Sequence, residues 1–326
     1  MAGARCLRPL LRRAALSALA AGAVLGTAGS RPAYAGTWGL CERPQEAGVA
    51  EQDRRLRFAA AVQQALDDSG QTVALIARSG MDLGRFGVLY SHAGIALRSP
   101  ETGRWSVRQL YYACDVARPR IYDQGLPGFV LGADGVRAGH VAVVLLPGPA
   151  GAALERVARD RDTALSLLAQ DYSANAYAFS TRYQNCNQWV AEMLARAWAP
   201  WGSGESADPP LTPRAQAQRW LRAQGYAPQP LPAGSHALMF AAHFAPLVHV
   251  DDHPLQDIQA LRWRTSLPRD IEEFARRQVP GAQRIGLCHD TRRAVVHRGW
   301  TPDRPELVTP AGCAAAEEDT VVALDR

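Results

Sequence analysis

Two residues in this chain of 326 amino acids combine a reactive side chain with local sequence that suits thiol chemistry. His92 lies in SHAGIAL (residues 91–97), which alternates like a strand, and Cys186 begins the helical pattern of NCNQWV (residues 185–190). A helix start stabilises a thiolate through its free N–H groups and its dipole, so a lowered pKa is expected for Cys186. A strand holds an imidazole rigidly enough to accept and return a proton. The pair predicts a nucleophile and its general base.

The residues around Cys186 indicate how the nucleophile would be supported. Asn185 is a favourable N-cap type, and Trp189 belongs to the apolar face behind the cysteine. The N–H of Cys186 is expected to help bind an oxyanion, with a second donor from Gln184 or a nearby backbone amide. We therefore predict Gln184, Asn185 and Trp189 as oxyanion or substrate-binding residues.

A third polar group should orient the imidazole, and the strand after the hairpin lies beside the His92 strand. Gln109 is the preferred candidate because its amide oxygen can accept a hydrogen bond from a ring N–H. Tyr111 and Asp115 are the alternatives on the same stretch. A solvated strand residue is an equally good interpretation of Gln109.

Two other groups of polar residues are less persuasive as sites. Three histidines and two aspartates gather between residues 243 and 253, and such ligands suit zinc. Pro246 and Pro254 break helical spacing there, so surface loop residues are the better interpretation. In CHD (residues 288–290) adjacent side chains do not face one another, which favours a structural disulfide. Without a phosphate-binding loop or a G-x-S-x-G elbow, we predict no metal and no cofactor.

Residues 1–35 are typical of a secretory signal peptide. Four arginines precede an alanine-rich apolar stretch, and Ala33-Tyr34-Ala35 forms a cleavage site. The stretch is too short to favour a membrane anchor, and we expect no integral membrane segment after cleavage. The segment holds five of the 36 basic residues and no acidic one, so the mature chain balances its 31 acidic residues. A neutral, exported chain predicts a periplasmic or secreted protein without a nucleic-acid partner.

Five cysteines follow the predicted signal peptide, and an odd number leaves at least one thiol without an intramolecular partner. Export permits disulfides. Cys288 with Cys313 is the favoured pair because the two lie close in sequence, and Cys41 with Cys114 is possible. The remaining thiol is then best assigned to Cys186.

The order of predicted elements indicates an α+β fold with a core domain over residues 36–204. Residues 205–326 form an extension packed on the core or a small second domain. A helix is expected over 50–68, with Leu56, Val62 and Leu66 on one face, and an irregular segment over 118–139. The remaining expected elements are strands at 72–77, 88–97, 105–112, 140–146, 284–287 and 294–298, and helices at 152–170, 186–199, 213–225 and 271–277.

These motifs resemble the NlpC-type cell-wall peptidase superfamily. SHAGIAL is similar to its H-x-G-I strand, and NCNQWV is similar to the Asn-Cys helix start of its circularly permuted branch. In that branch, which contains lecithin retinol acyltransferase-like proteins and permuted papain-like amidases, His precedes Cys, as it does here. The whole pattern also resembles a bacterial family, domain of unknown function 2145.

The resemblance implies a permuted papain-like core, in which an antiparallel sheet packs on the Cys-bearing helix. It implies Cys186 as the nucleophile and His92 as the base, with Gln109 where relatives carry His or another polar group. We expect hydrolysis of an amide, ester or thioester in a small-molecule or peptide substrate of the cell envelope, with cell-wall peptides preferred over lipid amides or esters. A non-catalytic module that binds envelope peptides or a partner protein is the alternative.

Overall fold

The computed structural model describes residues 41, 48–81, 83–132, 139–200, 211–300, 308–309 and 312–325. The predicted signal segment lies outside these residues. The helices are η1 Gly84–Phe86, α2 Val49–Asp67, α3 Leu126–Leu131, α4 Gly148–Arg159, α5 Arg161–Ser166, α6 Cys186–Trp198, α7 Pro213–Ala223, α8 His236–Ala242, α9 Leu255–Gln259 and α10 Pro268–Gln278.

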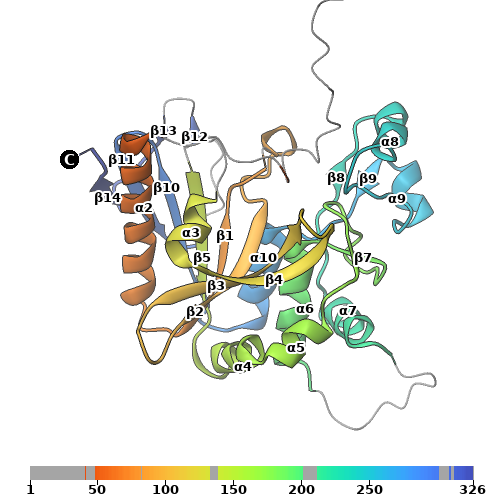
Figure 1. The fold of residues 1–326 in the computed structure, drawn as a ribbon, viewed down its shortest axis with the longest axis horizontal. Coiled ribbons are helices and arrows are strands. Elements are labelled where there is room, and N and C mark those ends of the chain that lie inside the picture. The colour runs from red at the N-terminus through yellow and green to blue at the C-terminus, as the bar shows by residue number, and fades with distance from the viewer. Residues whose placement is uncertain are drawn as a thin grey trace, which may run out of the picture.

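An eight-stranded sheet forms the centre of the molecule, in the order β14-β11-β10-β5-β1-β2-β3-β4 (Figure 1). All its neighbouring strands are antiparallel, which confirms an α+β fold with a large antiparallel sheet. The strands of the large sheet are β1 Val73–Arg78, β2 His92–Arg98, β3 Trp105–Ala113, β4 Arg118–Gly125, β5 Gly139–Leu145, β10 Gln283–His289, β11 Arg293–Arg298 and β14 Thr320–Ala323. The two-stranded pairs are β6 Asp171–Tyr172 with β7 Tyr183–Gln184, β8 Leu231–Pro232 with β9 Arg262–Trp263, and β12 Val308–Thr309 with β13 Gly312–Cys313.

The two faces of the sheet bury separate apolar clusters because side chains alternate along each strand. On β2, Ala93, Ile95 and Leu97 pack in the cluster that contains α6 residues, while Ala96 packs with α2 and α3 residues. Helices α2 and α3 therefore cover one face, and α6 with α4, α7 and α10 covers the other. This division determines on which side of the sheet each candidate site residue lies.

Gly94 is required where β2 and β3 pack closely. A Cβ atom at Gly94 would lie 2.5 Å from Val107 Cγ1 and 3.1 Å from the Arg108 carbonyl oxygen. Such a separation is far below a normal contact distance, so a side chain at Gly94 would displace β3. The glycine keeps β3 beside the strand that carries His92.

The segment predicted as irregular over 118–139 instead contains β4 and α3. Pro119 made a strand there look unfavourable, but β4 is the edge strand of the sheet, where a missing N–H is tolerated. The predicted helix over 152–170 is two helices. Asp160 ends α4 with an extended backbone and accepts a hydrogen bond from Asp162 N to cap α5.

The helix predicted over 213–225 is α7, and the Thr212 side chain caps its start by accepting a hydrogen bond from Ala215 N. The helix predicted over 50–68 is α2, but its buried face was placed wrongly at one position. Val62 and Leu66 are fully buried, whereas Leu56 is 49% exposed, and Phe58 takes part in the core instead. The late strand pair forms as β10 and β11, and β10 pairs directly with β5.

The two predicted disulfides are present. Cys41 is bonded to Cys114 and Cys288 to Cys313, with Cα–Cα distances of 5.7 and 6.0 Å. Cys186 is the free cysteine of the described residues. Two disulfides are typical of proteins that fold in an oxidising, extracytoplasmic environment. None of the helices in the described ranges has the length and apolar character that a membrane span requires.

Candidate active site

His92 and Gln109 meet inside the protein as a hydrogen-bonded pair. The distance between His92 Nε2 and Gln109 Oε1 is 2.5 Å, and both side chains are at least nine-tenths buried. An amide oxygen only accepts, so Nε2 must carry the ring proton and Nδ1 is left as the proton acceptor of the neutral ring. Gln109 Nε2 donates to Gln124 Oε1 at 2.8 Å, which fixes the orientation of the amide.

Cys186 is the first residue of α6, and Asn185 is its N-cap. The Asn185 side chain accepts a hydrogen bond from Gln188 N at 2.7 Å and donates to Thr265 Oγ1 at 2.7 Å. The helix start predicted from NCNQWV is thus formed, and Asn185 has a capping role rather than a free binding role. The thiol is 94% buried, lies beside the backbone of Ala93 and makes a 3.6 Å contact with Asn187 Oδ1.

Cys186 and His92 are related through the backbone of β2, but their side chains lie on opposite faces of the sheet. The N–H of Ala93, which faces the sulfur, belongs to the peptide bond that follows His92. The His92 ring, however, packs 5.8 Å from Phe129 on the α3 side of the sheet, whereas Cys186 belongs to the cluster under α6. No hydrogen bond links the two side chains among the residues described by the structure.

Burial keeps both groups neutral. Desolvation raises the pKa of Cys186 to about 11, against the lowering effect of the N–H groups of Asn187, Ala93 and Cys186 and of the Arg78 charge. Desolvation, followed by Arg78, lowers the pKa of His92 to about 3. The expectation of a lowered thiol pKa is therefore wrong for this resting state, because burial outweighs the helix terminus. The resting pair is a thiol and a neutral imidazole.

Sequence reasoning missed Arg78, which stands opposite His92 in the register of β1 and β2. It is 96% buried and donates to Tyr111 Oη and to the Ser79 carbonyl oxygen, both at 3.1 Å. Its guanidinium lies 5.4 Å from the centre of the Phe129 ring. An arginine near the end of a buried apolar strand was a signal that the sequence did offer, since such a charge is seldom buried without a reason.

The family model described as "uncharacterized protein conserved in bacteria (DUF2145)" matches residues 65–275. This chain is a DUF2145 protein. The same comparisons returned no matching curated protein and no matching solved structure. The DUF2145 segment contains Arg78, His92, Gln109 and Cys186 and ends within α10, so strands β10 to β14 follow it.

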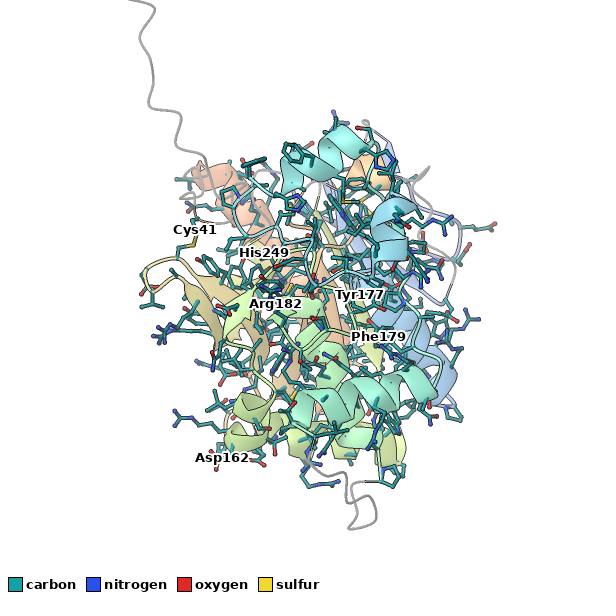
Figure 2. The ribbon with its side chains drawn as sticks, turned by 90° about the vertical axis from the view of Figure 1, so that its right-hand side faces the viewer. Cys41, Asp162, Tyr177, Phe179, Arg182 and His249 are labelled. Atoms are coloured by element: carbon teal, nitrogen blue, oxygen red, sulfur yellow. A yellow bond between two sulfur atoms is a disulfide. The ribbon has the colours of Figure 1, made fainter. Side chains whose placement is uncertain are left out.

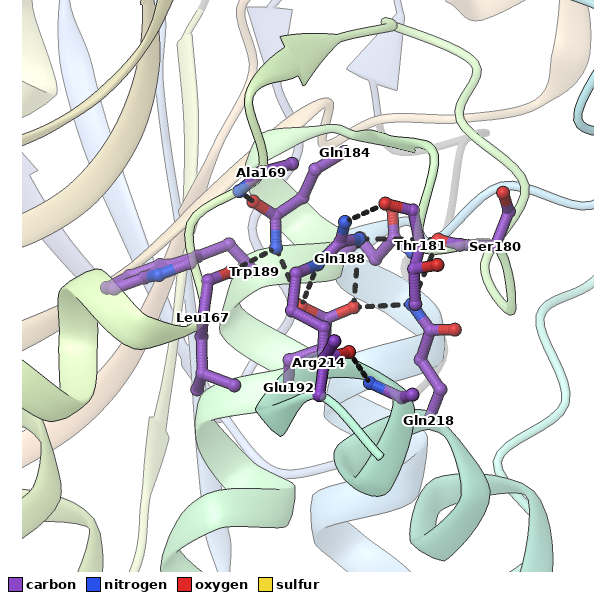
Figure 3. Close-up of polar contacts among 12 residues, drawn as sticks. Leu167, Ala169, Ser180, Thr181, Gln184, Gln188, Trp189, Glu192, Arg214 and Gln218 are labelled. Carbon is purple, nitrogen blue, oxygen red and sulfur yellow. Dashed lines mark hydrogen bonds and ion pairs between the residues drawn. The ribbon is translucent and has the colours of Figure 1, made fainter. Parts of the chain in front are cut away.

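The side-chain amide of Gln184 in this DUF2145 protein uses both its oxygen and its nitrogen in hydrogen bonds inside the fold. Its amide oxygen accepts from Ala169 N at 3.0 Å, and its amide nitrogen donates to Leu167 O and to Glu192 Oε2 at 2.9 and 2.7 Å. Trp189 is completely buried and donates from Nε1 to Ala164 O at 3.2 Å. The Gln184 side chain is therefore fully hydrogen-bonded and the Trp189 side chain fully buried, and the oxyanion and binding roles predicted for the two residues stay predictions. Figure 3 shows Gln184 in a polar network that includes Glu192.

That network centres on a buried ion pair between α6 and α7. Glu192 is completely buried, and its Oε2 atom lies 2.9 Å from Arg214 Nε. Gln184 and Gln218 donate to the two carboxylate oxygens, each at 2.7 Å (Figure 3). Burial is the largest influence on Glu192 and raises the pKa of its carboxyl. The network fixes the N-terminal half of α6, and with it Cys186.

The polar group between residues 243 and 253 has structural contacts. The His249 ring stacks on Tyr183 at 4.2 Å, close to Arg182 on the face shown in Figure 2. The Asp252 carboxylate accepts from Tyr177 N at 2.9 Å, and His253 Nε2 bonds Asn175 O at 2.8 Å. In the described ranges, the one group of three side chains close enough to share a metal ion is His297, Glu318 and Asp319, far from these residues in sequence.

Proposed function

We propose that this DUF2145 protein is an exported cysteine hydrolase in which Cys186 is the nucleophile, His92 the general base and Gln109 the residue that orients the imidazole. The substrate bond is an amide, an ester or a thioester, and peptides of the cell envelope are the preferred substrate class. The observation that supports the proposal is the position of two groups next to the same peptide bond of β2. A free cysteine begins a capped helix beside the N–H of Ala93, and the preceding residue bears an imidazole whose Nδ1 has no hydrogen bond to another described residue.

The proposed reaction begins with a neutral pair. The Cys186 sulfur attacks the carbonyl carbon while the thiol proton moves to His92 Nδ1. The imidazolium then protonates the leaving group as its bond to the acyl carbon breaks, which leaves a thioester on Cys186. Water attacks the thioester and gives a proton to Nδ1, and the acid product departs as the thiol is restored. The N–H groups at the start of α6 are the proposed donors to the oxyanion, because a helix leaves them unpaired.

The burial of both side chains sets a condition on this reaction. A thiolate and an imidazolium are each disfavoured by desolvation, so the ion pair does not accumulate before substrate binds. His92 Nδ1 must come within hydrogen-bond distance of the sulfur in the substrate complex. Catalytic hydrogen bonds are often long in a free enzyme and shorten when substrate binds. Proton transfer and attack are therefore concerted in the proposal.

An activity screen with a matched variant tests the proposal. The mature protein and Cys186→Ser are compared on muropeptides, acyl amides and thioesters, with Cys288 and Cys313 left intact. The proposal expects turnover of at least one class by the wild type and a loss of more than a hundredfold in Cys186→Ser. Equal turnover in the two proteins on every hydrolysed substrate would falsify the nucleophile assignment.

A non-catalytic envelope-binding module is the second candidate. It is favoured by the burial of the thiol and by the different surroundings of the two side chains. His92 packs against Phe129, whereas Cys186 packs in the cluster that contains α6. A module of this kind would bind the same envelope peptides equally well as wild type and as Cys186→Ser, and neither protein would release a product.

A further inference from the structure

Three arginines in the described residues are at least nine-tenths buried: Arg78, Arg214 and Arg284. Arg214 lies 2.9 Å from Glu192, and Arg284 lies 2.7 Å from Glu272. Arg78 has no carboxylate within ion-pair distance in the part of the chain that the structure describes. A buried charge without a counter-ion is strongly unfavourable, so the missing anion needs an explanation.

The guanidinium of Arg78 has donors to spare. Of its five N–H groups, one is bonded to Tyr111 Oη and one to Ser79 O, both neutral acceptors. The Nε atom is buried and has no hydrogen-bond partner. A carboxylate can bind an arginine through two parallel N–H groups, and Nε with a neighbouring Nη presents that pair.

Two glycines pack closely against the guanidinium. A Cβ atom at Gly80 would lie 3.0 Å from Arg78 Nη1, and one at Gly132 would lie 3.2 Å from Nη2. A side chain at either position would crowd the charge. Phe129 covers one face of the guanidinium, so a ligand would have to approach it along its edge.

The position of Arg78 relates its guanidinium to the proposed site. Arg78 pairs with His92 across β1 and β2, and both residues contact Phe129 and Tyr111. A group bound to Arg78 therefore lies next to the imidazole. Because Arg78 pairs with His92 across the two strands, the guanidinium, the imidazole and the Ala93 backbone next to the thiol lie in one region.

We infer that Arg78 binds a carboxylate of the substrate, so that the hydrolase prefers substrates with a free carboxyl group near the scissile bond. That the bound anion belongs to a substrate rests on the proposed function, but carboxylate binding by Arg78 does not depend on catalysis. The substrate class is then an acylated amino acid or a peptide cleaved close to its carboxyl end. Binding supplies the counter-ion that no described carboxylate of the chain provides to Arg78.

Binding of two matched probes to a catalytically silent protein tests the inference. N-acetylglycine carries a carboxylate, and N-acetylglycinamide is its neutral counterpart. Both are titrated by NMR into Cys186→Ala, Cys186→Ala/Arg78→Gln and Cys186→Ala/Arg120→Gln, the last changing an exposed arginine on β4. The inference expects N-acetylglycine to bind Cys186→Ala at least tenfold more tightly than the amide, with that preference lost in the Arg78 variant and kept in the Arg120 variant.

Gly132→Ala provides a second variant that keeps the charge and crowds Nη2 of Arg78, and it too should weaken N-acetylglycine binding while the protein stays folded. Equal affinity for the two probes, no binding of either, or an unchanged preference in Arg78→Gln would each overturn the inference. Because the silent protein cannot hydrolyse anything, binding can succeed where the proposed hydrolase fails. Turnover of neutral substrates, with no preference for those that carry a carboxylate, would support the proposed hydrolase and overturn the inferred anion site.

Discussion

The 2.5 Å contact between His92 Nε2 and Gln109 Oε1 determines which ring nitrogen of His92 is free to take a proton. Replacing Gln109 by Ala removes the acceptor and leaves Nε2–H buried without a partner. We expect a loss of about 10–100-fold in kcat, part of the contribution that a positioned base makes, and about 1–3 kcal/mol in the free energy of unfolding. Steady-state kinetics and urea unfolding measure the two effects.

Gln124→Ala is the matched control, since it removes only the outer bond to the Gln109 amide and lies on an exposed part of β4. It should retain most of the activity. An unchanged kcat in Gln109→Ala would show that the His92–Gln109 pair is structural alone.

The neutral state of His92 predicts acid sensitivity. The folded protein holds the pKa of His92 at about 3, mainly through burial, while the unfolded chain protonates this residue below about 6.5. The unfolded state therefore binds more protons between these limits, and stability is full above pH 6.5 and falls as the pH drops towards 3. From pH 7 to pH 5 this residue alone should lower the free energy of unfolding by about 2 kcal/mol.

Urea unfolding at the two pH values, for wild type and for His92→Asn, isolates this contribution. The variant should lose about 2 kcal/mol less than the wild type over the same interval. His140, whose pKa burial lowers to about 4, is unchanged in both proteins and cancels in the comparison. An identical pH dependence in the two proteins would contradict the neutral, buried imidazole.

The buried Glu192–Arg214 pair predicts an asymmetric result. Arg214→Met leaves the Glu192 carboxylate buried without its cation and should destabilise the protein by about 3–5 kcal/mol. Adding Glu192→Gln removes the uncompensated charge and should recover part of that loss. Thermal unfolding of the two variants measures the difference, and a double variant as unstable as the single one would refute the charge explanation.

The Cys288–Cys313 bond closes a loop with a sequence separation of 25 residues. Chain entropy alone then predicts that replacing both cysteines by Ala costs about 3 kcal/mol of stability. Ellman titration of the denatured, unreduced mature protein should find one thiol in the wild type and one in this variant, because both retain free Cys186. Three thiols in the wild type would show that one of the two disulfides does not form.

The sequence predicted the parts of this site that depend on local pattern. Asn185 as N-cap, Cys186 as the free thiol, and Gln109 beside His92 each follow from one helix start, one odd cysteine count and one hairpin. The hydrogen bonds of the Gln184 side chain could not be predicted, because its partner Glu192 becomes part of a buried ion pair only when α7 brings Arg214 against it. The burial predicted for Leu56 was wrong for a similar reason, since only the packing of α2 on the sheet determines which face of the helix is covered.

The electrostatics of the site were beyond the reach of local pattern. A helix start lowers a thiol pKa in water, but the fold of α6 against β2 removes the water, and burial then dominates. Arg78 was overlooked because its strand reads as apolar up to its last residue. Its significance comes from the register with His92 and from the absence of a nearby carboxylate among the described residues, neither of which one strand reveals.

The central claim is that Cys186 carries the acyl group, and intact-mass and peptide mass spectrometry after brief reaction with p-nitrophenyl acetate tests it most directly. The chain has no lysine, which limits acetylation elsewhere. The account predicts a single acetyl group on the peptide that contains Cys186, reduced at least tenfold in His92→Asn and absent in Cys186→Ala. Acetylation that is absent from Cys186, or that is equal in the wild type and His92→Asn, would contradict it.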